Sequence, residues 1–133
     1  MTLAAPAPST RDLPGLIVST ALGGGGTIVT LRGECDYATR PALLEILTEL
    51  IVAGDGPVVI DLAETTFIDG GSVRAVTRAA DVLSDGGRPL TIRAPTRLAR
   101  RVLAICEASH LVQPPLARAS ASPDVRANGG AAG

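Results

Sequence analysis

Two carboxylates, Asp36 and Asp69, are the residues whose types come closest to catalytic chemistry, because paired carboxylates can act as general acid and base. The loops expected around them contain no His, Lys or second nucleophile, and the whole chain contains no lysine. We therefore expect no enzymatic activity, and no phosphoaspartate site, which would need a lysine beside an acidic cluster. Asp69 is expected to accept amide hydrogen bonds or cap a helix, and Asp36 either caps a helix or contacts a partner.

Ser72 follows two glycines at the start of an expected helix, and two interpretations of its hydroxyl stay open. It is either a first-turn hydroxyl that satisfies a free backbone N–H, or a phosphoacceptor whose phosphate the helix dipole would accommodate. Gly70 and Gly71 are interpreted as a tight turn rather than a nucleotide loop, because both the GxGxxG and the Walker pattern are absent.

The two cysteines, Cys35 and Cys106, have two interpretations as well. They form either a regulatory disulfide or, as is commoner for a cysteine on the apolar face of a helix, inert buried thiols. No C-x-x-C motif or Cys/His cluster provides the ligands of a zinc site. We expect no metal and no cofactor.

Apolar spacing and Gly/Pro punctuation predict the elements that position these residues. Two strands, 16–20 and 27–31, form a hairpin through a loose turn at 23–26, and an amphipathic helix covers 39–53. Strand 57–62 is a continuous apolar run, typical of a parallel strand buried on both faces. A second helix follows FIDGG and ends at Gly86, strand 90–93 comes next, and a third helix begins at Pro95 and Thr96. Its outward face carries Arg97, Arg100 and Arg101, and Leu111 and Val112 form a last short strand.

The order β-β-α-β-α-β-α-β predicts an α/β fold, a mixed sheet with helices packed against it. Ligands and partners of such sheets gather at the carboxyl ends of the parallel strands. That edge is expected to carry Asp61, Glu64, Thr65, Thr66, Asp69, Gly70, Gly71 and Ser72.

The 133 residues make one domain, expected over 13–116, between disordered tails at 1–12 and 117–133. A net charge of −1 gives no electrostatic footprint for nucleic acid or an anionic membrane. A signal peptide and a long apolar run are both absent, so we expect a cytoplasmic protein.

Four segments, LRGECDYATRPAL, VVIDLAETTFIDGGSVRAV, GGRPLTIRAPT and VLAICEASHLV, together resemble the STAS domain of bacterial anti-sigma-factor antagonists over about residues 13–112. Gly33, Glu34 and Asp36 fit the family's G-E-x-D turn. Asp61 fits the end of the central strand, and Phe67 and Asp69 fit the following loop. The resemblance implies that the protein binds an anti-sigma factor, often a serine kinase of the histidine-kinase-like ATPase superfamily, and so releases a sigma factor.

The resemblance also implies a switch, because the family is phosphorylated on a Ser or Thr two residues after the loop aspartate. That position is Gly71 here, and Ser72 comes one residue later. The family's last strand and closing helix are likewise replaced by QPPLARASASPDV. We therefore expect an antagonist without the usual phosphoserine switch.

The leading hypothesis is a non-enzymatic binding module for an anti-sigma factor. Its expected docking surface comprises Asp36, Thr66, Asp69, Gly70, Gly71, Ser72 and the second helix. The alternatives are a small-ligand or nucleotide sensor on the same fold, and a scaffold subunit of a signalling assembly. The oligomeric state, monomer or homodimer, stays open.

Overall fold

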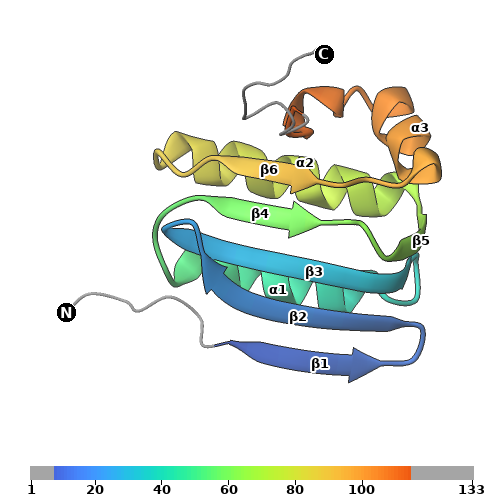
Figure 1. The fold of residues 1–133 in the computed structure, drawn as a ribbon, viewed down its shortest axis with the longest axis horizontal. Coiled ribbons are helices and arrows are strands. Elements are labelled where there is room, and N and C mark those ends of the chain that lie inside the picture. Colours follow the sequence, from blue (N-terminus) through green and yellow to red (C-terminus); the bar gives the residue numbers. More distant parts are fainter. Residues whose placement is uncertain (1–7, 115–133) are drawn as a thin grey trace, which may run out of the picture.

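A mixed sheet of six strands forms the centre of residues 8–114, the part of the chain that the computed structural model describes (Figure 1). The strand order is β1-β2-β3-β4-β6, and β5 pairs with the far end of β3. β2 pairs in antiparallel fashion with both β1 and β3, whereas β4, β5 and β6 join the sheet in parallel. The strands are β1 (Ser9–Leu13), β2 (Leu16–Gly23), β3 (Gly26–Cys35), β4 (Val58–Asp61), β5 (Thr65–Ile68) and β6 (Leu90–Arg93).

The helices are α1 (Arg40–Val52), α2 (Gly70–Asp85) and α3 (Arg97–Ile105), and a short 3-10 helix covers Ser109–Leu111. Figure 1 shows α1 and α2 side by side against one face of the sheet, with α3 at the end where β5 lies. The apolar residues of α1 recur every three or four positions and are buried against the sheet, as an amphipathic helix requires. The predicted α/β fold with a mixed sheet is confirmed.

The predicted N-terminal hairpin is confirmed too, and its strands are longer than expected. β2 and β3 pair in antiparallel register down to Gly23 opposite Gly26. The two residues between them, Gly24 and Gly25, have φ of +61° and +80°. Two consecutive positive φ values match the turn that best fits the twist of a two-residue hairpin, and glycine adopts them without strain.

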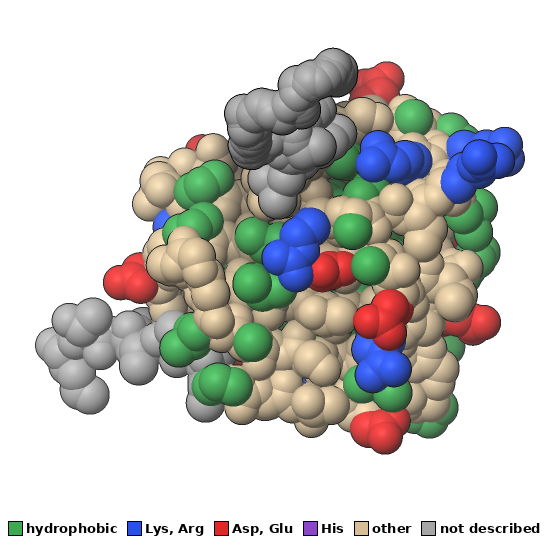
Figure 2. Space-filling model, viewed as in Figure 1, with side chains coloured by type: hydrophobic (Ala, Val, Ile, Leu, Met, Phe, Trp, Pro, Cys, Tyr) green, Lys and Arg blue, Asp and Glu red, His purple; other side chains and the backbone are tan. Residues whose placement is uncertain are grey.

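β4 is the central parallel strand, between β3 and β6, but it is not buried on both faces as its continuous apolar run predicts. Val58 and Ile60 are fully buried beneath the helices, whereas Val59 and Asp61 are only half-buried. The reason is that helices cover one face of the sheet, while Figure 2 shows the other face with apolar and charged side chains mixed on it. Arg93 pairs there with Asp61 at 2.7 Å.

The N-terminal end of the fold differs from the prediction. Residues 9–12 were expected in a disordered tail, which is wrong, because Ser9–Leu13 forms β1 and pairs along β2. Polar and charged residues make up most of this edge strand, so it lacks the alternation of apolar and polar residues that predicts a strand. Arg11 connects the strand to α1 through an ion pair with Glu45 at 2.9 Å. Such residues are typical of edge strands because they discourage pairing with other chains.

The last predicted strand is reduced to one bridge between Val112 and Ile92, because Leu111 belongs to the 3-10 helix. β5 was not predicted, since its four residues merge with the loop that follows β4. The expected tail at 117–133 lies outside the described residues. Among residues 8–114, no helix has the length and apolar character needed to cross a membrane.

Candidate functional site

The end of β3 is shaped by Gly33, the glycine of the G-E-x-D turn. Its φ is +115°, and a β-carbon at this position would overlap the carbonyl oxygen of Gly15. The pairing of β3 with β5 shifts register between Gly33 and Glu34, so a bulge bends the strand here. Glu34 N–H donates to the same Gly15 carbonyl at 2.8 Å. Glycine at position 33 therefore allows the close backbone contact with Gly15 that sets the direction in which the chain leaves β3.

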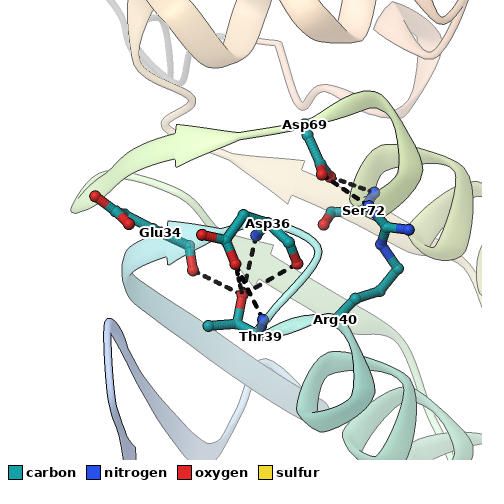
Figure 3. A network of polar contacts seen from close by, with 6 residues as sticks. All are labelled: Glu34, Asp36, Thr39, Arg40, Asp69 and Ser72. Carbon is teal, nitrogen blue, oxygen red and sulfur yellow. Dashed lines mark hydrogen bonds and ion pairs between the residues drawn. The ribbon is translucent and has the colours of Figure 1, made fainter.

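Asp36 and Thr39 hold that loop in a reciprocal pair of hydrogen bonds (Figure 3). Thr39 N–H donates to Asp36 Oδ1 at 3.0 Å, and Asp36 N–H donates to Thr39 Oγ1 at 2.9 Å. The Thr39 hydroxyl in turn donates to the carbonyl of Glu34 at 2.9 Å. Two residues three positions apart that bond each other's backbone N–H groups form the same arrangement as a capping box, here in the turn that leads into α1. Asp36 therefore orders the turn before α1 rather than capping the helix itself, whose N-cap residue is Thr39, and its contact with a partner stays a prediction.

Asp69 is the N-cap of α2, as one of its two interpretations predicts. Its Oδ1 accepts from Ser72 N–H at 2.8 Å, and its Oδ2 accepts from Arg40 Nη2 at 2.7 Å. Burial acts to raise the pKa of Asp69, but the hydrogen bond from Ser72 and the charge and hydrogen bond of Arg40 outweigh it, so the pKa is lowered. One carboxylate therefore joins the starts of α1 and α2.

Arg40 lies directly against Gly71. A β-carbon on Gly71 would overlap the guanidinium group of Arg40. Gly71 is the second residue of α2 and its φ is not positive, so Gly70 and Gly71 form the first helical turn rather than the predicted tight turn. The missing side chain at position 71 makes room for the cation that pairs with Asp69.

Ser72 is fully buried, with 0% of its surface exposed. Its hydroxyl oxygen has no hydrogen-bond partner among the described residues, and it is the backbone N–H of Ser72 that is capped, by Asp69. The interpretation as a hydroxyl that satisfies a free N–H is therefore wrong. Burial also argues against the phosphoacceptor interpretation, because a kinase must reach the oxygen that it modifies.

The two thiols lie in different environments. Cys35, the last residue of β3, is buried, and burial together with the charges of Asp69 and Asp36 raises its pKa to about 12. Cys106, just after α3, is half-buried, and its sulfur would lie 3.6 Å from a β-carbon on Gly70. Both are free thiols, so a disulfide between them stays a prediction that this structure does not support.

We expect only one of these thiols to react in the folded protein. A thiol with a raised pKa holds little thiolate at neutral pH, and burial denies the reagent access, so Cys35 should stay unmodified. Alkylation with iodoacetamide, read by intact mass, should add one group, and Cys106→Ser should remove it. Reaction of Cys35 at the rate of Cys106 would contradict this account, and unfolding in denaturant should make both react.

The structure brings together only part of the predicted sheet edge. The segment from Asp69 to Ser72 lies beside the end of β3, where Asp69 N–H donates to the carbonyl of Cys35 at 3.0 Å, and Thr66 is exposed on the neighbouring β5. Asp61 and Glu64 do not join this network, because Arg93 and Arg32 pair with them. Thr65 is buried and bonds the carbonyl of Leu31 at 2.7 Å.

Sequence reasoning missed Thr39, Arg40 and the surface beside them. The ring of Tyr37 is 82% exposed, and the Arg40 guanidinium lies 5.6 Å from its centre. A shallow hollow of about 370 Å³ lies next to it, lined by Tyr37, Ala38, Arg40, Pro41 and Leu44. The one sequence signal that could have identified Arg40 as a site residue is its position at a predicted helix start among apolar neighbours. Its pairing across 29 residues is invisible in one sequence.

Metal binding is not supported by this arrangement. Within residues 8–114, His, Cys, Asp and Glu side chains do not gather in groups of three or more that could hold an ion. The helix N-terminus at Asp69 is also unsuited to a small anion, because its carboxylate already accepts the free N–H of Ser72. What the site offers is a rigid, charged loop beside exposed apolar side chains.

Comparison with known proteins identifies the family of this chain and proteins that share its fold. The family model described as "Mlab, STAS domain" matches residues 18–113. A search of curated proteins finds no match. Among solved structures, an anti-sigma factor antagonist from Mycobacterium paratuberculosis is 21% identical and superposes with a TM-score of 0.66, covering 88% of this chain and 95% of that one.

The anti-sigma factor antagonist SpoIIAA in its unphosphorylated form is 15% identical, with a TM-score of 0.62 over 72% of this chain and 85% of that one. The Bacillus cell fate determinant SpoIIAA in its phosphorylated form is 14% identical, with a TM-score of 0.59 over 72% of this chain and 88% of that one. At these identities the superpositions show a shared fold. Because the family model spans most of the chain, the resemblance seen in its motifs is confirmed, and the chain belongs to the STAS-domain family.

Proposed function

We propose that this protein is an anti-sigma-factor antagonist, a binding module that captures an anti-sigma factor and so regulates sigma-factor-dependent transcription. The observation that carries the proposal is the ion pair between Arg40 and Asp69, which holds the starts of α1 and α2 together beside exposed apolar side chains. Membership of the STAS family and a fold shared with proteins described as anti-sigma factor antagonists support it.

The proposed docking surface combines a preorganised polar centre with exposed apolar contacts. Its centre is the ion pair of Arg40 with Asp69, for which Gly71 leaves room at the starts of α1 and α2. Around it, Tyr37 is 82% exposed and Phe67 is 43% exposed. Exposed aromatic side chains are the usual anchors of protein interfaces. A loop that is already ordered loses little conformational entropy on binding.

A kinase-like anti-sigma factor is the partner class that this proposal names, and the usual phosphoserine switch is not part of it. Gly71 has no hydroxyl, and the neighbouring Ser72 hydroxyl is buried. SpoIIAA, which shares this fold, occurs in a phosphorylated form, so the lack of an accessible hydroxyl here is a difference from a phosphorylated protein of the same fold. We propose that the protein stays competent to bind its partner without a phosphate-dependent step.

This proposal predicts that the folded protein resists phosphorylation at Ser72. Incubation with ATP and the kinase-like anti-sigma factor of the same genome should leave this chain unmodified, because its buried oxygen is out of reach. Intact-mass measurement and phosphopeptide mapping give the result, and a phosphorylatable antagonist of the same kinase serves as the positive control. Stoichiometric phosphate on Ser72 would refute the proposal of a missing switch while leaving the binding role intact.

Binding itself is tested by titrating the protein with that anti-sigma factor in a calorimeter. Thr66→Arg places a bulky charge on an exposed site of β5 and should weaken affinity by about tenfold or more, with the melting temperature unchanged. Leu22→Arg is the matched control, since Leu22 is 57% exposed at the hairpin turn, the opposite end of the sheet from Asp36. Equal affinities for both variants would contradict the proposed docking surface, and no binding by the unmodified protein would contradict the partner class.

A further inference from the structure

We propose that the exposed face of α3 is a separate docking surface for an acidic, amphipathic segment of a protein partner. Arg100 and Arg101 follow Arg97 by three and four residues, and all three arginines are exposed, so they share one face of the helix. Among the described residues, none of the three has a carboxylate within 4.0 Å, although five other arginine–carboxylate contacts of this length occur there.

Arg97 lies where the helix dipole disfavours a positive charge. The first turn of α3 holds no acidic residue, and Arg97 occupies its first position. Cations are disfavoured at a helix N-terminus because the helix dipole is positive there. Carboxylates from a partner would relieve this repulsion and would pair with guanidinium groups in a two-pronged geometry. The charge pattern of α3 is thus complementary to an acidic ligand.

Apolar side chains beside the arginines show that the ligand is not purely ionic. Ile105 is 79% exposed and Leu98 is 43% exposed, and they are seven positions apart, so they lie in one stripe along α3. Only Ala99 and Leu103 of this helix are buried. Figure 2 shows arginine and apolar side chains together at the upper right, where Figure 1 places α3.

A protein segment satisfies both features better than a nucleic acid or a membrane. A phosphate backbone has no apolar surface to cover Ile105 and Leu98. A nine-residue helix with two exposed large apolar side chains offers too small an apolar face for stable insertion at a bilayer surface. An amphipathic segment with carboxylates on one side and aliphatic side chains on the other covers both the arginines and the stripe.

The direct test uses a fluorescently labelled synthetic peptide that forms a helix with Glu on one face and Leu on the opposite face. The protein is titrated into this peptide, and binding is followed by fluorescence anisotropy. Arg100→Glu with Arg101→Glu should weaken peptide binding by about tenfold. Arg74→Glu with Arg78→Glu is the matched control, because these exposed arginines of α2 give the same change in net charge at another place. The control pair should leave binding within about twofold, and added salt should weaken binding to the unmodified protein.

Two further variants keep the test decisive. Ile105→Ser should weaken binding at every salt concentration, since it removes apolar contact rather than charge. If the Arg100→Glu, Arg101→Glu variant has a lowered melting temperature, the Arg100→Gln, Arg101→Gln variant, which removes the charges without reversing them, takes its place. Equal weakening by the α2 and α3 pairs, equal binding of a peptide with Lys in place of Glu, or attachment only to vesicles of anionic lipid would each overturn the proposal. Thr66→Arg should not affect the peptide, so the outcome is independent of the proposed anti-sigma role.

Discussion

Replacing Gly33 with alanine should destabilise the protein by about 2 kcal/mol or more. Its φ of +115° is a conformation that side chains rarely adopt, and the new β-carbon would overlap the Gly15 carbonyl. Neither group can move away cheaply, because Gly33 belongs to a paired strand and Gly15, in the turn before β2, accepts a backbone hydrogen bond from Glu34. Urea denaturation monitored by circular dichroism measures the free energy of unfolding.

Gly24→Ala is the matched control for this prediction. Gly24 also has a positive φ, +61°, but nothing lies within 4 Å of its would-be β-carbon. The control should therefore cost only about 1 kcal/mol, from backbone strain alone. If both variants lost the same stability, the close contact between Gly33 and Gly15 would not be what restricts this position to glycine.

Asp69→Ala should lower stability by about 1 to 2 kcal/mol and also weaken partner binding. It removes the side-chain cap of α2, and it leaves the Arg40 guanidinium, only 26% exposed, without its carboxylate. Asp69→Asn is the matched variant, because asparagine caps a helix well but carries no charge. It should keep most of the stability, so a loss of affinity in Asp69→Asn would come from the missing charge. Equal stability of the Ala variant and the unmodified protein would contradict the cap.

The pH dependence of the same pair follows from the direction of the Asp69 shift. The pKa of Asp69 is lowered in the folded protein from its ordinary value of 3.8. Its contribution to stability is therefore fully present above that value and is lost as the pH falls through the lower, folded-state pKa. The stability difference between the unmodified protein and Asp69→Asn should be constant near neutral pH and should shrink below about pH 4.

The sequence predicts the layers of this fold well, because they follow from periodic apolar patterns. The strands of the hairpin, the central strand and the three helices all have strong local signals, such as the glycine turn and the spacing of Leu43, Leu47 and Leu50. β1 and β5 lack such signals. Pairing with neighbours decides their structure, and a polar edge strand or a four-residue strand shows no period that single-sequence reasoning can detect.

The candidate site was predictable in its carboxylates but not in its geometry. Asp36 and Asp69 stood out because helix-start aspartates have a local role. The role of Arg40 could not be foreseen, since it depends on two helix starts 29 residues apart and on an empty space at Gly71. The expectation that the Ser72 hydroxyl satisfies a free N–H was wrong because this side chain is buried, and its burial depends on packing between elements that one sequence does not show.

The central claim, that an anti-sigma factor docks on the starts of α1 and α2, is tested most directly by hydrogen exchange of the complex. Amide exchange should be compared, by mass spectrometry, between the free protein and the protein saturated with the kinase-like anti-sigma factor of its genome. The account predicts slower exchange confined to peptides that contain Tyr37, Phe67 and Gly71, with the Gly24 turn unchanged. Protection at the Gly24 turn with none at Tyr37, Phe67 and Gly71 would contradict it.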